Sequence, residues 1–256
     1  MVNKEAKIAV YFYDDGSRGS KVLREFLDKT EIDALQSDGF RSSLSRLLPE
    51  GRKNVYMYLD KELVDVDHLC CLAHARAKFK YAQEQGKDAD AEYFITNIGR
   101  LYDLEEQYRL RHFTPQQIQQ ERQGELTSKI IQKIRQRLDK LLADTSVMRG
   151  DLMHKALNYL KSFWNQLFLY IKDGRYCIDN SLAERTLRPM TVESKNSLTF
   201  GSHAGAKVSV IYHTFIETCK MCGVSTLDYF KEFFKAIMRG RTDYENMLPM
   251  TIGIKK

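Results

Sequence analysis

Residues 66–85 read VDHLCCLAHARAKFKYAQEQ, an apolar run followed by a helical pattern. The first seven residues have the content of a buried strand, and the pattern from Ala73 onward is that of a helix. Similar strand patterns occur at residues 7–15 and 32–36, each followed by a helical pattern. Strands that alternate with helices predict an α/β layer built on a sheet over residues 1–87.

The middle of the chain differs, because residues 88–172 contain no strand pattern. Apolar residues recur every three or four positions over residues 126–141 and again over residues 153–171, which predicts two long amphipathic helices. A third helix is expected over residues 93–108. We therefore expect a mainly helical insertion at 88–172 that buries its own apolar stripes.

Residues 173–240 carry further helical patterns, and residues 241–256 predict a loose tail. Pro189 is expected to end the first of these helices, Gly223 to cap the second and Ser225 to open the third. The three helices are expected at residues 180–188, 203–222 and 226–240. The fold class is therefore α/β and helix-rich overall.

The composition is that of a globular protein: 43% of the 256 residues are hydrophobic and 29% are charged, which excludes wholesale disorder. The net charge of +6 permits a polyanionic partner without requiring one, since a solvated surface explains most such excesses. No apolar run approaches the ~20 residues of a membrane span, and the N-terminus has no signal-peptide pattern. The five cysteines are an odd number without framework spacing, and together with the missing signal peptide they predict a reducing cytoplasm. Because no run is long enough to span a membrane, we expect no membrane partner.

Two predicted strands end in residues that could carry chemistry. Asp38 follows the strand at 32–36, where a carboxylate can face a ligand crevice, although the spacing alone favours an Asx-turn in Ser-Asp-Gly. Cys71 and His74 are three residues apart at the next strand-to-helix junction. They lack the remaining ligands of a structural zinc site, even though His68 and Cys70 are near, so a structural histidine is favoured and no zinc is expected.

The segment IDNSLAERTLRP, residues 178–189, is dense in polar groups for a helix between apolar runs. Glu184 and Arg188 are four residues apart, so an ion pair on the helix surface is the alternative to a site. Asp179, Asn180 and Arg185 add to this density, and either of the first two could cap the helix. The segment therefore indicates the edge of a site.

Residues 201–205, Gly-Ser-His-Ala-Gly, open a predicted helix whose backbone N–H groups could hold a phosphate. Ser202 lies in this stretch, and Lys195 and Lys207 flank it together with the arginines of the preceding helix. Phosphate contacts on DNA would need such a cluster, although a solvated basic face would also show one.

Cys219 and Cys222 form a C-x-x-C pair inside an apolar periodic run. A zinc or redox role would need such a pair, but there is no second pair in the chain. The pattern favours two small buried side chains on one helix.

The sequence contains no P-loop, no G-x-G-x-x-G and no G-x-S-x-G, and nothing supports a Ser/His/Asp triad. Acids with basic flanks instead favour metal-assisted cleavage or transfer of phosphodiesters. Two Mg²⁺ ions about 4 Å apart would stabilise the attacking and leaving oxygens, and several carboxylates would be needed to hold them.

At this point four stretches, in order, resemble the catalytic region of insertion-sequence transposases of the IS-66 type. They are LQSDGF, CLAHARAKF, IDNSLAERTLRP and KNSLTFGSHAGAKVSVIYHTFIETCKMCGV. In the second stretch Leu72 replaces the family's usual tryptophan. The third and fourth stretches together are highly specific, whereas Ser-Asp-Gly alone is not.

The resemblance implies a ribonuclease-H-like core, a mixed sheet flanked by helices, interrupted by a mainly helical insertion between the second and third acids. Asp38 would be the second acid and Glu184 the third, and both would bind Mg²⁺ or Mn²⁺. The DNA or the acids would be positioned by His74, Cys71, Arg76, Asp179, Asn180, Arg185 and Arg188, with Lys195, Ser202 and Lys207 as phosphate contacts.

The resemblance also implies function and partners. DDE transposases cleave and transfer DNA strands at transposon ends. The partners would be transposon-end and target DNA, further copies of the chain and accessory proteins of the same element. The chain would act in the bacterial cytoplasm, associated with the nucleoid. The family's first acid would lie upstream of Met1, so we expect a truncated chain with impaired activity. Two alternatives stay open: a non-catalytic DNA-binding or oligomerising fragment that modulates transposition, and an inactive remnant.

Overall fold

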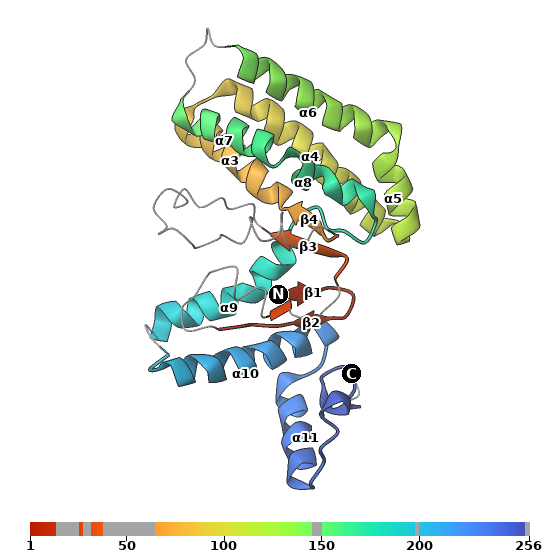
Figure 1. Cartoon of the computed structure of the whole chain (residues 1–256), viewed down its shortest axis with the longest axis vertical. Helices are drawn as coiled ribbons and strands as arrows, with labels where there is room; N and C mark the ends of the chain where they lie inside the picture. The colour runs from red at the N-terminus through yellow and green to blue at the C-terminus, as the bar shows by residue number, and fades with distance from the viewer. Residues whose placement is uncertain (14–25, 28–31, 38–64, 145–149, 198–199, 254–256) are drawn as a thin grey trace. The chain divides into compact units, whose positions relative to one another are not determined.

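The computed structural model describes residues 1–13, 26–27, 32–37, 65–144, 150–197 and 200–253, and for residues 194–197 it describes the backbone alone. The chain forms two units (Figure 1). The central unit is Gly19–Asn180, and the terminal unit combines Met1–Arg18 with Ser181–Lys256. The helices expected after the first two strands fall on residues outside this description, except that residues 26–27 are helical.

The central unit contains a short parallel sheet. Strand β3 (Ala34–Ser37) pairs with β4 (Asp67–Cys70), and helix α3 (Leu72–Gly86) begins two residues after β4 ends. Four residues of α3 at helical spacing are buried, namely Leu72, Ala75, Phe79 and Ala82. The strand-to-helix transition predicted from residues 66–85 is therefore confirmed.

The helices of the central unit pack around one core. They are α4 (Ala89–Leu110), α5 (Pro115–Gln123), α6 (Glu125–Ala143), α7 (Asp151–Ser162), α8 (Trp164–Phe168) and the 3-10 turn η2 (Leu169–Lys172). Helix α3 packs against α4 and α7, and α4 packs against α6 (Figure 1). The rings of Phe79 and Phe94 stack with their centroids 4.3 Å apart. The described residues of 88–172 contain no strand, as the sequence pattern predicted.

The single long helix expected over residues 153–171 is wrong. Helix α7 ends at Ser162, and Phe163 leaves the helical conformation with φ −112° and ψ 18° before α8 begins. Phe163 is nevertheless buried, so the apolar spacing continues through the break. A periodicity of apolar residues detects the buried face and not the interruption of the hydrogen-bond ladder.

The terminal unit combines a small antiparallel sheet with helices. Its elements are β1 (Val2–Asn3), β2 (Ile8–Ala9), α9 (Ser181–Ser197), α10 (His203–Cys222), α11 (Thr226–Met238) and the 3-10 turn η3 (Tyr244–Met247). The buried Thr218 of α10 ties the helix to β2, because its Oγ1 accepts from Ala9 N–H at 3.2 Å and donates to Ala9 O at 3.1 Å. A strand was predicted over residues 7–15. Within the described residues 1–13, β2 covers only Ile8–Ala9 of that range.

Both predicted caps in this unit are confirmed. Gly223 ends α10 in the left-handed conformation with φ 69°, where glycine carries no steric cost. Ser225 opens α11, and its hydroxyl accepts from the backbone N–H of Asp228.

Two other predictions for the terminal unit are wrong. Pro189 lies inside α9 and does not end it. Proline removes one helical hydrogen bond, but packing of the helix outweighs that local preference, and the Tyr11 hydroxyl donates to the carbonyl of Thr186 on its inner side. The tail is also not loose throughout, because Met247 of η3 is buried and accepts a 3.1 Å bond from the Tyr229 hydroxyl.

The fold is thus helix-rich with small sheets. Among the described helices, none combines the length and the apolar character that a membrane crossing requires. The predicted boundaries at residues 87, 172 and 240, and the ribonuclease-H-like arrangement of the sheet, stay predictions.

Candidate functional site

The carboxyl ends of β3 and β4 meet at one edge of the parallel sheet. Ser37 is in register with Cys70, and Cys71 N–H donates to Ser37 O at 2.9 Å. Ligands of α/β proteins bind at this edge of a parallel sheet. Asp38 follows Ser37 in the chain but lies outside the described residues. Its metal-binding role stays a prediction.

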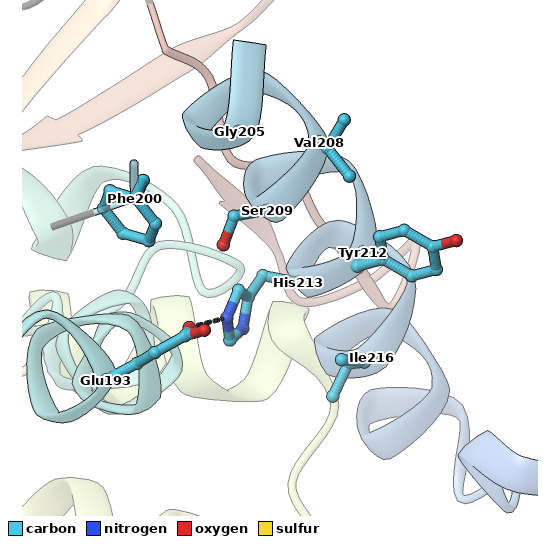
Figure 2. Close-up of a pocket in the computed structure, with 8 residues that line it drawn as sticks. All are labelled: Glu193, Phe200, Gly205, Val208, Ser209, Tyr212, His213 and Ile216. Carbon is cyan, nitrogen blue, oxygen red and sulfur yellow. Dashed lines mark hydrogen bonds and ion pairs between the residues drawn. The ribbon is translucent and has the colours of Figure 1, made fainter. Parts of the chain in front are cut away.

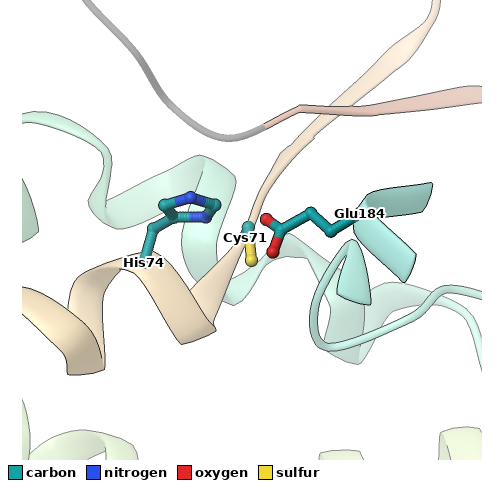
Figure 3. A group of neighbouring side chains, drawn as sticks. All are labelled: Cys71, His74 and Glu184. Atoms are coloured by element: carbon teal, nitrogen blue, oxygen red, sulfur yellow. The ribbon is translucent and has the colours of Figure 1, made fainter. Parts of the chain in front are cut away.

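Cys71 and His74 lie at the junction of β4 and α3, and a ligand nitrogen of the imidazole lies within 4.8 Å of the thiol sulfur (Figure 3). Glu184, also drawn in Figure 3, comes from α9 and is described with the terminal unit. Cys71 is fully buried, and burial raises the pKa of its thiol. The expectation that this junction holds no zinc stays a prediction.

The segment before α9 is bonded to this junction. Leu72 N–H donates to Ile178 O at 3.2 Å, and Asn180 N–H donates to the Cys71 sulfur at 3.5 Å. The structure therefore brings Cys71, His74, Asp179 and Asn180 together within the central unit, at the edge where β4 ends. This is the part of the predicted site whose geometry is described.

Tyr102 of α4 also belongs to this group, although no sequence pattern singled it out. Burial and, after it, the charge of Asp179 raise the pKa of the Tyr102 hydroxyl above its ordinary value. The Asn180 side-chain oxygen is buried, and the described residues supply it with no hydrogen-bond donor. A buried carbonyl oxygen without a donor is costly, so it marks a point where a ligand or water could bind.

Arg76 extends away from this group. Its side chain is exposed, and its Nε donates to Ile95 O of α4 at 3.4 Å.

Helix α9 of the terminal unit presents Glu184, Arg185 and Arg188, and all three side chains are exposed. Thr186, by contrast, is buried. Burial and, after it, the charge of Glu217 raise the pKa of Tyr11 to about 12, so the Tyr11 hydroxyl stays protonated as the donor to Thr186 O. One side of α9 is therefore held in the unit while the predicted site residues face outward.

The amino-terminal end of α10 carries the predicted phosphate contacts. The Ser202 hydroxyl caps the helix by accepting from Gly205 N–H at 3.0 Å, which uses one of the N–H groups that could meet a phosphate. A Cβ on Gly205 would lie 2.2 Å from Phe200 O, so this turn requires glycine. Lys207 is exposed one turn further, and the side chain of Lys195 lies outside the description.

A shallow groove of about 700 Å³ runs beside α10, and Phe200, Val208 and Ile216 contribute to its apolar lining (Figure 2). His213 and Glu193 point toward one another there, with Nε2 and Oε2 2.5 Å apart. The buried His213 Nδ1 has no partner among the described residues. The sequence could not predict this pair, because its members are 20 positions apart on two helices. The bond joins α9 to α10.

The two cysteines of the C-x-x-C pair are both buried in α10. Burial raises the pKa of Cys219 to about 11, so its thiol keeps its proton at neutral pH. Their environment favours the buried interpretation over a zinc or redox site.

The comparisons with known proteins agree with the motifs. A family model described as Transposase IS66 family matches residues 1–208. The chain is 26% identical over 247 residues to Uncharacterized protein y4qI of Sinorhizobium fredii, covering 94% of this chain and 43% of that protein. It is 24% identical over 182 residues to Uncharacterized protein y4jD of the same organism, covering 70% and 35%. The chain thus spans less than half the length of these relatives, and no solved structure matches it.

Proposed function

The chain belongs to the IS66 transposase family, and from this premise we propose that it acts in metal-dependent cleavage and transfer of DNA strands at transposon ends. The observation that carries the proposal is the family match itself, because residues 1–208 include Asp38, Glu184 and the polar groups around them. The matched relative y4qI is more than twice as long as this chain. The activity of a full-length family member is therefore only proposed for it.

Asp38 and Glu184 are proposed to bind Mg²⁺ or Mn²⁺. The donor chemistry fits, because carboxylate oxygens are the ligands Mg²⁺ prefers, and the Glu184 side chain is exposed. When bound, the ions would stabilise the attacking and leaving oxygens of a phosphodiester. We expect slow cleavage by this chain, because only two acids of the family's three are assigned in it.

The groups at the β4–α3 junction are proposed to position the reacting parts. Asn180 and Asp179 would orient the start of α9 through the bond to Cys71, and His74 would face the same edge. Arg185 and Arg188 would contact DNA phosphates, since both are exposed on the helix that carries Glu184. In these roles the side chains would position the acids and the DNA, and they would not bond to the reacting atoms.

We also propose that β3 and β4 belong to a ribonuclease-H-like sheet, with the helical stretch 88–172 inserted between its two acids. The parallel pairing of β3 and β4 supports this, as does the position of Asp38 directly after β3. The proposed partners are transposon-end and target DNA in the bacterial nucleoid, further copies of the chain and accessory proteins of the same element.

The test is a nicking assay on supercoiled plasmid with Mg²⁺ or Mn²⁺ as the added metal. We expect slow, metal-dependent nicking that Asp38→Asn and Glu184→Gln each abolish. Glu125→Gln is the matched control, because this glutamate is 81% exposed on α6, outside the proposed site. Nicking that persists in Glu184→Gln would contradict the proposed role.

A second candidate is a non-catalytic fragment that associates with other copies, and one feature of α11 favours it. Leu227 is 65% exposed, Phe234 47% and Met238 87%, which is more apolar exposure than a solvated helix needs. Light scattering on the purified chain tests it: a multimer that Phe234→Ser with Met238→Ser returns to monomer would support association. A wild-type chain that is monomeric at high concentration would exclude it.

A further inference from the structure

Helix α11 carries an apolar stripe on its exposed side. Leu227 and Phe234 are seven residues apart and Phe234 and Met238 are four apart, so these three side chains lie along one side of the helix. All three are exposed, although apolar side chains at this spacing normally mark the buried side of a helix. We call Leu227, Phe234 and Met238 the α11 stripe. An exposed stripe with a polar rim is typical of a contact with another macromolecule.

The opposite side of α11 is already covered by its own unit. Tyr229 is buried, and its ring centroid lies 5.7 Å from that of Phe215 on α10. The Phe215 ring also lies 6.1 Å from Phe233, and the Tyr229 hydroxyl donates to Met247 O of η3. Helix α10 and the C-terminal segment thus pack on the inner side of α11 (Figure 1). The residues that the structure describes leave the α11 stripe open.

Charged side chains line one flank of the α11 stripe. Asp228, Glu232, Lys235 and Arg239 follow one another at steps of four, three and four residues, so they share this flank. Glu232 and Lys235 pair with each other at 2.7 Å. Asp228 and Arg239 make no ion pair with any residue in the described part of the chain. The flank therefore has an unpaired negative charge where α11 begins and an unpaired positive charge where it ends.

The order of these charges is symmetric about the middle of the helix, the point between Phe233 and Phe234. Asp228 and Arg239 are equally distant from that point along the chain, and so are the two members of the internal ion pair. A twofold axis through this point and across the helix generates an antiparallel second α11 and keeps the same flank of both helices together. Asp228 of each copy then meets Arg239 of the other. A parallel second copy would instead set the charged flank of one helix against the uncharged flank of the other.

The uncharged flank follows the same symmetry with apolar side chains. Phe230 and Ile237 are also equally distant from the middle of α11, so each meets the other in an antiparallel pair. Tyr212 of α10 is exposed, and its ring centroid lies 5.6 Å from that of Phe230. The apolar surface therefore continues onto α10 at the end of α11 where Ile237 of a second copy would arrive.

We propose that α11 packs antiparallel against α11 of a second copy of this chain, with the two α11 stripes in the centre and an Asp228–Arg239 pair at each end. Exposed ion pairs add little affinity, so the apolar stripes provide the binding and the charges set its direction. The inference rests on the second candidate function, for which it names the surface and the direction of pairing. The association needs neither DNA nor metal.

A lipid surface is the main alternative partner of an amphipathic helix. Lys231, Lys235 and Arg239 would favour anionic headgroups. Asp228 and Glu232 lie beside these cations, and an anionic surface repels them. In the antiparallel pair both acids face a cation of the second copy. The charges of the flank therefore favour a second copy over a lipid surface.

The experiment measures the dimer dissociation constant by sedimentation velocity in EDTA without DNA. Asp228→Arg and Arg239→Asp each place like charges at both ends of the antiparallel pair, so each variant alone should associate about 10- to 100-fold more weakly. An equal mixture of the two variant chains has opposite charges at both ends, so it should recover the wild-type constant within a few-fold.

The matched control uses two charges in the same helical positions elsewhere. Asp151 is an exposed acid in the first turn of α7, and Arg111 is an exposed cation that caps the end of α4. Asp151→Arg and Arg111→Asp should leave the dissociation constant unchanged. Recovery in the mixture of the two α11 variants would also show that neither change had simply unfolded the chain.

Equal dissociation constants for the wild type and both α11 variants would overturn the antiparallel pairing, and so would weakened association that the mixture does not recover. If Phe234→Ser with Met238→Ser still gave a monomer in either case, association through α11 would stand and its direction alone would be wrong. A wild-type chain that is monomeric but binds phosphatidylserine vesicles through the α11 stripe would overturn the inference together with the second candidate function. The nicking assay judges the proposed cleavage independently of all these results.

Discussion

Arg122 is a buried cation that holds together three parts of the central unit, and its removal should be severely destabilising. Its side chain is 3% exposed and makes a bidentate pair with Glu105 of α4, at 2.8 Å and 2.7 Å. The guanidinium also donates to the carbonyls of Tyr170, Asp173 and Tyr176, at 2.7–3.0 Å. The segment that it holds leads directly to Asn180.

The expected cost of Arg122→Met follows from these five bonds. One buried and two partly buried carbonyls lose a donor at about 1 kcal/mol each, and the Glu105 carboxylate, 19% exposed, loses its cation. Breaking a buried pair costs about 3–5 kcal/mol, and we expect the variant to lie in that range. Urea unfolding followed by circular dichroism measures it, and hydrogen exchange should show early opening of residues 170–176.

Arg109 supplies the matched control. It pairs with Glu106 in the same bidentate geometry, but the two side chains are 69% and 54% exposed. Solvent screens an exposed pair of this kind, so Arg109→Met should be nearly neutral. If Arg122→Met lowered the free energy of unfolding no more than Arg109→Met does, burial would not determine how much the ion pair stabilises the protein. That result would contradict the prediction.

Two further predictions concern the same unit. A Cβ on Gly174 would lie 1.8 Å from Pro115 O, so Gly174→Ala should cost about 3 kcal/mol or more, and an unchanged urea midpoint would show that the loop can yield. Burial alone would raise the pKa of Asp67, but bonds from Lys172 and Tyr176 hold it below its ordinary value of 3.8. Its stabilisation is therefore present above about pH 4 and lost as the pH falls further, so Asp67→Asn should lower stability at pH 7 and flatten the acid limb of stability against pH.

Local signals predicted the ends of helices well where a cap sets them. The bounds of α10 and the glycine that follows it were predicted from the sequence, because a left-handed cap has a residue requirement that is visible in one position. Pro189 shows the limit of such signals, since packing in α9 outweighs one lost hydrogen bond. The break at Phe163 shows another, because the apolar spacing runs through it.

Pairs between elements could not be predicted. Arg122 meets Glu105 across two helices, and Glu193 meets His213 in the same way, so no spacing within one helix identifies either pair. Tyr102 became part of the candidate site only because α4 packs beside α3. The residues at the carboxyl end of β4 were predicted, since strand ends have a fixed relation to the edge of a parallel sheet.

The central claim is that Asp38 and Glu184 hold the catalytic metal. Fe²⁺ can replace Mg²⁺ at such a site, and with peroxide and ascorbate it cuts the protein backbone next to where it is bound. We expect cuts at both Asp38 and Glu184, with both sets lost in Asp38→Asn and in Glu184→Gln. Cuts confined to the Cys71–His74 junction, or cuts that neither variant changes, would contradict it.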